Sequence, residues 1–163
     1  MLIRTATSDD AEAIRTIYNV EVETSTVTFD LRARTFAEQR RWIDKRSGVH
    51  TVVVATSDEG LVIGFGSLSP YKERPAYSTT VENSVYVHRQ HQGIGVGPAI
   101  LAELVARAEQ HGFHSVVARI VGGHQASINL HARAGFTIVG HEREIGRKFN
   151  QWLDVVTMQL LFD

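Results

Sequence analysis

The sequence predicts a mixed α/β fold of the α+β kind, in which helices cover the faces of a central sheet. Two observations support this prediction. The apolar pattern switches between strand and helix periodicity in the order βααβββαβαββ, which gives seven strands and four helices. No repeat, linker or low-complexity segment interrupts the 163 residues, so we expect a single domain spanning residues 1–163.

The first half of the chain is predicted to contain two helices between strands. Each helix start carries a capping box, in which a short polar residue is followed three positions later by Glu. The turn residues 57–60 then join two β-rich runs into a hairpin. The predicted elements are the strand Leu2–Ala6, a helix opened by Asp9 and Glu12, a helix opened by Thr35 and Glu38 that runs towards Gly48, and the strands His50–Thr56 and Leu61–Ser69.

The second half alternates strands and helices. Its longest helix has an apolar stripe, supported by an i,i+4 pair of Glu103 and Arg107, and ends at His111-Gly112. The predicted elements are the strand Val81–Val87, the helix that follows Gly93–Gly97, the strand Ser115–Val121, the helix Gln125–Ala134, and the strands Phe136–Arg143 and Asp154–Leu161.

The composition excludes several classes of function. A formal net charge of −1 provides no overall field that would hold nucleic acid or an anionic membrane. The absence of cysteine excludes disulfides, thiolate metal sites and a cysteine nucleophile. The eight histidines are scattered and form no HExxH pattern, so no metal is expected. No apolar run could span a bilayer and no signal-peptide pattern opens the chain, which predicts a cytoplasmic protein.

The segment Gln92–Pro98 is the most informative part of the sequence. It lies between a strand and a helix, where glycines allow close backbone approach and a helix N-terminus offers free N–H groups to an anion. It matches neither the P-loop string GxxxxGK[ST] nor the Rossmann fingerprint GxGxxG. It does fit (Gln/Arg)xxGx(Gly/Ala), which predicts a pyrophosphate cradle. The alternative is a tight strand-to-helix turn that binds nothing.

This segment resembles the coenzyme A-binding motif of the GNAT acetyltransferases. The run Leu130–Phe136, which ends in Gly-Phe, fits the next helix of that superfamily. Residues 23–29, 80–87 and 148–154 are similar to the subgroup of phosphinothricin and methionine sulfoximine or sulfone acetyltransferases. The resemblance implies a mostly antiparallel sheet, acetyl-CoA as acetyl donor and a homodimer. It implies that CoA contacts Val85, Tyr86, Val87, Gln92, Gly93, Ile94, Gly95, Val96, Gly97, Pro98, His124, Ser127 and Asn129.

The resemblance also implies which residues carry out acetyl transfer. The acceptor ammonium must lose a proton before attack, and the thioester oxygen needs a donor for its developing charge. Glu82 is implied as the general base, with a surface ion pair as the alternative. The N–H of Val87, near an expected bulge, is implied as the oxyanion donor. His131 takes the position of the tyrosine that protonates the leaving thiolate in many relatives, and a packed structural histidine is its alternative. His124 replaces the usual Asn, which leaves its contact with CoA open.

For the acceptor, the loop from Tyr71 to Tyr77 combines cations with aromatic residues. The guanidinium of Arg74 suits a bidentate contact with a carboxylate or phosphinate. The alternative is a solvated loop of ordinary surface charge. Trp42, Phe149 and Trp152 are expected to be core or interface residues. The substrate-binding residues implied by the resemblance are Phe29, Lys72, Glu73, Arg74, Tyr77, Glu82, Asn83 and Ser84.

The sequence therefore predicts an N-acetyltransferase that acts on the amino group of a small, amino-acid-like molecule. Phosphinothricin, methionine sulfoximine and methionine sulfone are the implied acceptors. Two alternatives remain: an enzyme that acetylates a protein N-terminus or lysine, and a CoA-binding module without catalysis.

Overall fold

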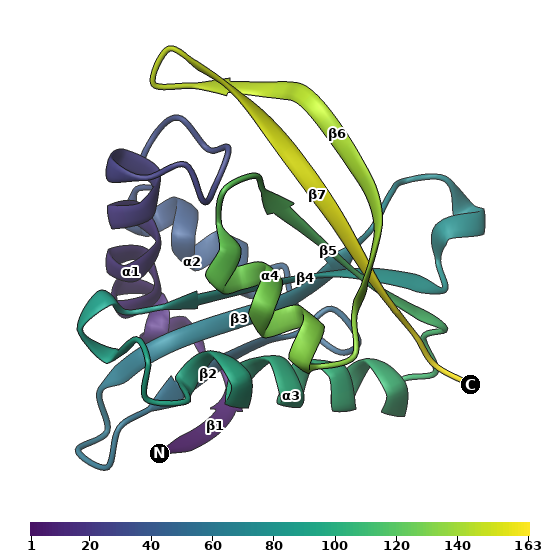
Figure 1. Ribbon diagram of the computed structural model, residues 1–163. Helices are drawn as coiled ribbons and strands as arrows, with labels where there is room; N and C mark the ends of the chain where they lie inside the picture. The colour runs from purple at the N-terminus through teal and green to yellow at the C-terminus, as the bar shows by residue number, and fades with distance from the viewer.

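The computed structural model describes residues 1–163 and contains one seven-stranded sheet, in the order β1-β2-β3-β4-β5-β7-β6 (Figure 1). All neighbouring strands are antiparallel except β4 and β5, which are parallel. The mixed α/β prediction is therefore confirmed. The strands are β1 Leu2–Thr5, β2 Val52–Thr56, β3 Val62–Pro70, β4 Thr80–Val87, β5 Ser115–Val121, β6 Thr137–Lys148 and β7 Gln151–Leu161.

Four α-helices accompany the sheet, and none has the length and apolar character needed to cross a membrane. They are α1 Ala11–Thr24, α2 Phe36–Asp44, α3 Val96–Gln110 and α4 Gln125–Arg133. Three short 3-10 helices, Ser8–Asp10, Pro75–Tyr77 and Arg89–His91, lie in the connections.

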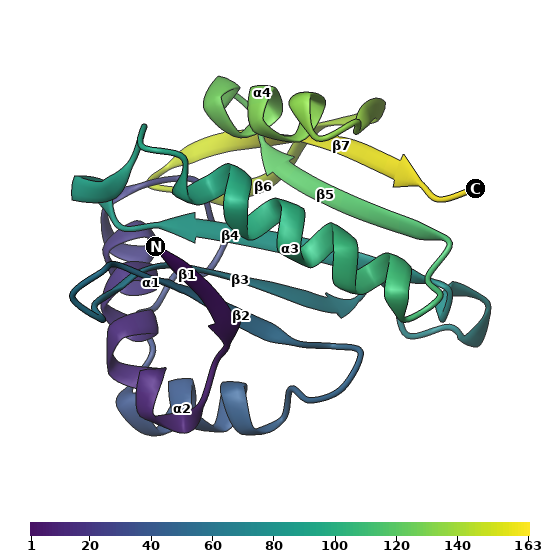
Figure 2. The ribbon, with the colours of Figure 1, turned by 90° about the horizontal axis from the view of Figure 1, so that it is seen from below.

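The two faces of the sheet carry separate apolar cores. Side chains alternate between the faces along each strand, so Val53 belongs to the core under α3 and its neighbour Val54 to the core under α1 and α2. In the predicted apolar stripe of α3, Ile100 and Leu104 are fully buried, whereas Val105 is partly buried. Figure 2 shows α3 on the near side of the sheet, with α1 and α2 on the other side. Burial of both faces fixes the position of the central strands, β3 and β4.

β4 and β5 separate along their length, and this separation creates the site. They pair only where Thr80–Glu82 lies beside Ser115–Val117. Beyond Glu82 no partner follows β4 on that side. The side chain of Asn83 spans the point of divergence, where its amide donates to the carbonyl of Val117 at 3.3 Å.

The free edge of β4 exposes backbone hydrogen-bonding groups to the resulting gap. The register of β3 and β4 is regular, and the N–H of His88 donates to the carbonyl of Ile63. Because hydrogen-bonded and non-hydrogen-bonded pairs alternate in an antiparallel ladder, the N–H and C=O groups of Val85 and Val87 point away from β3. They face the gap that β5 has left. The expected bulge at Val87 is absent, so divergence of β5, and not a bulge, frees this N–H.

Two local predictions were wrong. The first capping box is formed by Thr7 and Asp10, not by Asp9 and Glu12, and it precedes a 3-10 turn. Asp10 is chosen because Arg4 donates two hydrogen bonds to its buried carboxylate, at 2.7 and 2.8 Å. This contact between a strand and a turn is invisible to local spacing.

The last two strands are also longer than predicted and form a hairpin that ends at Phe149-Asn150. Both turn residues have positive φ, 48° and 59°. Asn tolerates this conformation but Phe rarely adopts it, so the turn lacks the usual Asn-Gly signature. Figure 1 shows the hairpin extending beyond the rest of the sheet towards the loop between α1 and α2.

Candidate active site

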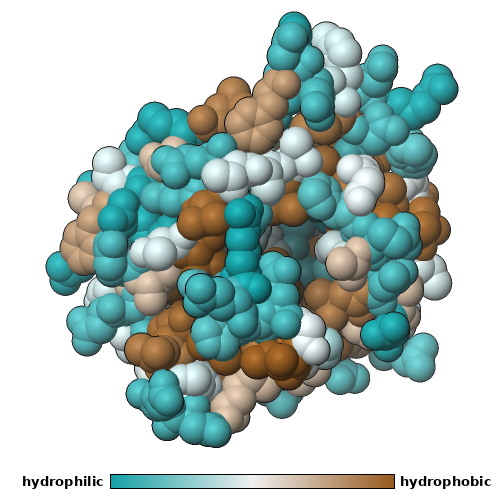
Figure 3. All heavy atoms as spheres, turned by 60° about the vertical axis from the view of Figure 1, so that its left-hand side comes forward, coloured by the Kyte–Doolittle hydropathy of each residue, from teal (hydrophilic) through white to brown (hydrophobic).

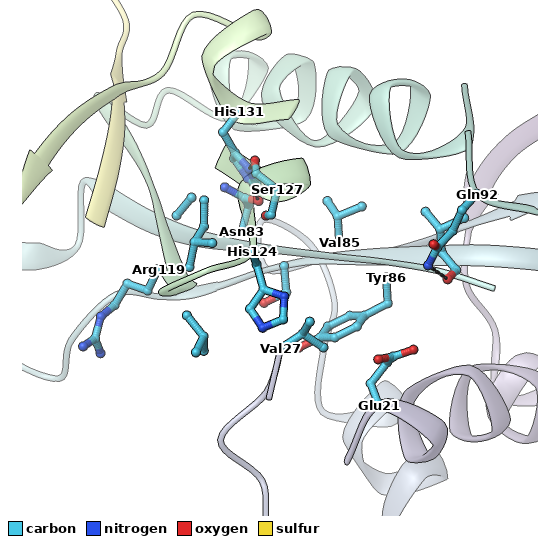
Figure 4. A pocket seen from close by; sticks show the side chains of 15 residues that line it. Glu21, Val27, Asn83, Val85, Tyr86, Gln92, Arg119, His124, Ser127 and His131 are labelled. Carbon is cyan, nitrogen blue, oxygen red and sulfur yellow. Dashed lines mark hydrogen bonds between the residues drawn. The ribbon is translucent and has the colours of Figure 1, made fainter. Parts of the chain in front are cut away.

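A pocket of about 180 Å³ lies where β4 and β5 separate. Figure 4 shows its lining side chains, with Arg119 at one end and Gln92 at the other. Residues of β4 and β5 form its floor, and α1, the α1–α2 loop and α4 contribute its walls. It is lined by Glu21, Val27, Asn83, Ser84, Val85, Tyr86, Val87, Gln92, Ala118, Arg119, Ile120, Val121, His124, Ser127 and His131.

A wider groove of about 830 Å³ continues from the pocket between α3 and α4. It passes the N-terminus of α3, where free N–H groups favour an anion. Gly93 and Gly95 have φ of 77° and 92°, and space is open around both. Only glycine adopts this conformation without strain. The loop was predicted to end at Gly97, but α3 already begins at Val96. Gly97 therefore lies in the first turn of the helix. Figure 3 shows a hollow in this side of the molecule.

The groove and the pocket together account for the predicted cofactor-binding residues, with one exception. Ile94 is 67% exposed and lines neither of them. The groove is lined by Val85, Val87, Gln92, Gly93, Gly95, Val96, Gly97, Pro98, Ser127 and Asn129 from the predicted set, together with Leu101, Ala102, Ala126, Leu130, Arg133 and Ala134. Tyr86 and His124 line the pocket.

His131 is held rigidly on α4 beneath the gap. It is 3% exposed and packs edge-on against Phe136. Its Nδ1 lies 2.8 Å from the carbonyl of Ser127, which can only accept, so Nδ1 carries a proton. Its Nε2 lies 3.0 Å from Oδ1 of Asn83. Because both nitrogens face acceptors, the hydrogen bonds favour the protonated, positively charged ring. Burial has the opposite effect and lowers the pKa of His131.

Glu82 lies on the opposite face of β4 from Asn83, because adjacent strand residues point to opposite sides. Burial raises the pKa of Glu82, and the positive charge of Arg119 partly offsets that effect. A carboxylate with a raised pKa is a stronger base than one with the ordinary pKa of an exposed glutamate. Glu82 is not among the residues that line the pocket, although its neighbours Asn83 and Ser84 are.

The α1–α2 loop closes the pocket on the Glu82 face. His124 lies 3.0 Å from Oγ1 of Thr26, which links this loop to the start of α4. Lys148 is 3% exposed and donates to the carbonyl of Thr28 at 2.9 Å. Burial lowers the pKa of Lys148, and the carboxylates of Asp30 and Glu21 oppose the shift. The ring of Phe29 packs directly against Gly146, which fixes the hairpin of β6 and β7 to the loop.

The predicted acceptor residues are only partly brought together. Asn83 and Ser84 line the pocket, whereas Phe29, Lys72, Glu73, Arg74 and Tyr77 do not. Lys72 lies over the rings of Tyr71 and Tyr77, at 4.9 and 5.3 Å from their centroids. These residues belong to the loop that precedes β4, where Arg74 is exposed. Trp42 packs against the core under α1 and α2, as expected, while Phe149 and Trp152 are exposed.

Sequence reasoning missed Glu21, Val27 and Arg119 as pocket residues. Glu21 belongs to a helix and pairs with Arg89 at 2.8 Å, so nothing in its local sequence marks it. Arg119 did carry a signal, because it is the only charged residue in the apolar run Ser115–Val121. A charge in a buried strand requires a partner or a function.

The site thus combines a free strand edge with a helix N-terminus that offers N–H groups to an anion. Similarity to known proteins identifies the family. The family model described as "Acetyltransferase (GNAT) domain" matches residues 3–157. The chain belongs to this GNAT acetyltransferase family, whose members use acetyl-CoA, and is an acetyl-CoA-dependent N-acetyltransferase. The predictions of superfamily, enzyme class and acetyl donor are thus confirmed.

Three known proteins illustrate the similarity. The chain is 37% identical to the L-methionine sulfoximine/L-methionine sulfone acetyltransferase of Pseudomonas aeruginosa, over 99% of this chain and 94% of that protein. A phosphinothricin acetyltransferase from Sinorhizobium meliloti, solved with AcCoA, superposes with a TM-score of 0.95 at 34% identity, covering 99% and 88% of the two chains. A ribosomal-protein-alanine N-acetyltransferase from Brucella melitensis superposes with a TM-score of 0.96 at 34% identity, covering 99% and 100%.

Proposed function

We propose that the protein transfers an acetyl group to the α-amino group of a small amino-acid-like acceptor of the methionine sulfone, methionine sulfoximine or phosphinothricin type. One observation carries the proposal. The free N–H groups of Val85 and Val87 lie in a gap that Glu82 and His131 flank from opposite faces of β4. In the proposed mechanism the base Glu82 and the acid His131 therefore act on the acetyl group from opposite sides. The names of similar proteins support the acceptor class.

The cofactor-side residues bind and orient the donor. The N-terminus of α3 and the loop Gln92–Pro98 hold a diphosphate, while the free edge of β4 pairs with the extended arm. The N–H of Val87 donates to the thioester oxygen as negative charge develops there. Acetyl-CoA supplies the acetyl group and a thiolate leaving group.

Glu82 and His131 move the protons. Glu82, directly or through a water, accepts a proton from the acceptor ammonium, which leaves a lone pair for attack. A C–N bond then forms and the C–S bond breaks, while the second amine proton leaves for solvent. His131 donates the proton on Nε2 to the thiolate sulfur and recovers one from solvent. Asn83 orients the ring through its contact with Nε2.

The size of the site favours a small acceptor over a protein. A pocket of about 180 Å³ holds a single amino acid but not a chain terminus with several side chains. The name of the Brucella melitensis protein keeps a protein acceptor as the second candidate.

An acceptor panel separates these candidates. The purified protein is incubated with acetyl-CoA and methionine sulfone, methionine sulfoximine, phosphinothricin, ordinary amino acids or peptides with N-terminal alanine, and thiol release is followed. We expect turnover with the first three and a product heavier by one acetyl group. Acetylated peptides with unmodified amino acids would refute the small-molecule assignment, and binding of acetyl-CoA without any turnover would indicate a non-catalytic module.

We also propose a homodimer assembled through the hairpin of β6 and β7. Six large apolar side chains of this hairpin are exposed, which is typical of an interface. They are Ile138, Val139, Ile145, Phe149, Trp152 and Leu161. Sedimentation of the wild type and of Trp152→Glu tests this assignment: a dimer that becomes a monomer supports it, and a monomeric wild type contradicts it.

A further inference from the structure

We propose that Arg119 binds the α-carboxylate of the acceptor and thereby selects α-amino acids over other amines. This inference rests on the proposed function and names a specificity residue for the same site. It is carried by the position of Arg119 in β5, by the groups around it and by the donors that it leaves free.

The position of Arg119 in β5 sets it apart from its neighbours. The other six residues of the strand are at most 6% exposed, whereas the Arg119 side chain is 38% exposed. It lines the pocket, so part of this exposure faces the site.

Arg119 lies on the same side of the sheet as the proposed base. In the parallel pairing of β4 and β5, Glu82 is level with Val117, and Arg119 lies two residues further on the same face. The two charges are close enough that Arg119 lowers the pKa of Glu82. In an α-amino acid the carboxylate carbon is two bonds from the amine. When the amine of such an acceptor faces Glu82, its carboxylate also lies near Glu82 and needs a positively charged partner there. Arg119 is such a partner.

The orientation of the pocket agrees with this assignment. Arg119 occupies the end opposite Gln92, beside which the cofactor groove opens (Figure 4). The donor enters from the Gln92 end, so the Arg119 end remains for the acceptor. Arg74, which the resemblance favoured for this contact, does not line the pocket.

The guanidinium of Arg119 retains unused donors. One nitrogen donates to Glu142 of β6 at 2.9 Å, and no other hydrogen bond involves this side chain. Because guanidinium has five donors, enough remain for a bidentate contact with a carboxylate. Glu142 is itself 42% exposed, and an exposed pair of this kind contributes little stability. This ion pair positions the guanidinium of Arg119 across β7 and leaves most of its N–H donors free.

Carboxylate binding would also assist catalysis. An acceptor carboxylate neutralises the charge of Arg119, which removes the influence that lowers the pKa of Glu82. Glu82 then becomes the stronger base when an α-amino acid is bound. An amine without a carboxylate loses both the contact and this activation.

The test compares two acceptors across matched variants. Methionine sulfone and its α-carboxamide share the amine and the sulfone, and differ in the carboxylate alone. We expect Arg119→Gln to raise KM for methionine sulfone about ten- to a hundredfold, the loss typical of a charged hydrogen bond, and to change KM for the carboxamide little. Arg119→Lys should recover part of the loss. Arg40→Gln, an exposed arginine of α2, is the matched control and should behave as wild type.

The outcomes separate failure of this inference from failure of the proposed function. A wild type that acetylates no α-amino acid refutes the proposed function, and the role of Arg119 falls with it. If the wild type is active and Arg119→Gln leaves KM for methionine sulfone unchanged, the role of Arg119 is refuted and the proposed function stands. An equal rise in KM for both acceptors has the same consequence. If Arg119→Gln does not fold, the wild type still decides: equal kcat/KM for the acid and the carboxamide overturns the inference.

Discussion

The proposed cofactor side and the proposed acceptor side of this site are built in different ways. The proposed cofactor side is centred on consecutive residues, namely one strand end, the loop Gln92–Pro98 and the first turn of α3, and α4 adds the opposite wall of the groove. The acceptor side joins segments that are distant in the chain, since Lys148 contacts Thr28 across 120 residues and Phe29 packs on Gly146. The first can be recognised from a short pattern, whereas the second exists only after the chain has folded.

The difference implies that the two substrates can be impaired separately. Contacts within the loop should govern acetyl-CoA, and contacts between the α1–α2 loop and the hairpin should govern the acceptor. Glu82 lies where the two sides meet and should affect neither affinity strongly.

The largest expected effect comes from Glu82→Gln. It removes the proposed base and keeps the shape of the side chain, so kcat should fall about 10²- to 10⁴-fold. Acetyl-CoA affinity, measured by calorimetry, should remain at the wild-type level. Glu59→Gln, an exposed glutamate in the β2–β3 turn, is the control. A fully active Glu82→Gln enzyme would mean that another group removes the proton.

The accuracy of the sequence-based predictions also differs between the cofactor side and the acceptor side. The order of elements and the second capping box were predicted because each depends on local spacing, and the loop Gln92–Pro98 was recognised from one contiguous motif. Leu101, Ala126 and Leu130 also line the groove but were not predicted. The first capping box was misplaced because Arg4 of β1 selects Asp10. Glu21, Val27 and Arg119 were missed because the divergence of β4 and β5 decides what faces the pocket. Tertiary contacts of this kind leave no periodicity to detect.

A glycine pair tests the cofactor side. Gly95→Ala places a Cβ on a residue with φ of 92°, which strains the loop, and we expect KM for acetyl-CoA to rise about five- to thirtyfold. Gly60→Ala imposes a comparable strain at φ of 84° in the β2–β3 turn, outside the groove. Steady-state kinetics should show no change in KM for acetyl-CoA in that control. Equal effects in both variants would mean that general destabilisation, and not the cradle, is responsible.

A second glycine pair tests the acceptor side. A Cβ at Gly146 would overlap the ring of Phe29, whereas one at Gly140 in the same strand would meet only Cβ of Thr157, at 3.8 Å. Because the Phe29 ring is partly exposed and can turn aside, we expect Gly146→Ala to raise acceptor KM modestly, about three- to tenfold. Acetyl-CoA binding should not change, and Gly140→Ala should change neither. A rise in KM for acetyl-CoA in Gly146→Ala would contradict the idea that the two substrates can be impaired separately.

The smallest expected effect concerns pH and connects both sides through Glu82. Burial raises the pKa of Glu82 and Arg119 lowers it. A base works when ionised, so kcat should rise as pH increases through that pKa. Without Arg119 the pKa is higher, and the rise should move to higher pH in Arg119→Gln than in Arg40→Gln. The profile of Glu82→Gln, which lacks the titration of this carboxylate but retains those of His131 and the acceptor amine, identifies the part due to Glu82. A rise displaced to lower pH would mean that Arg119 does not act on this carboxylate, because removing a neighbouring positive charge cannot stabilise the ionised form.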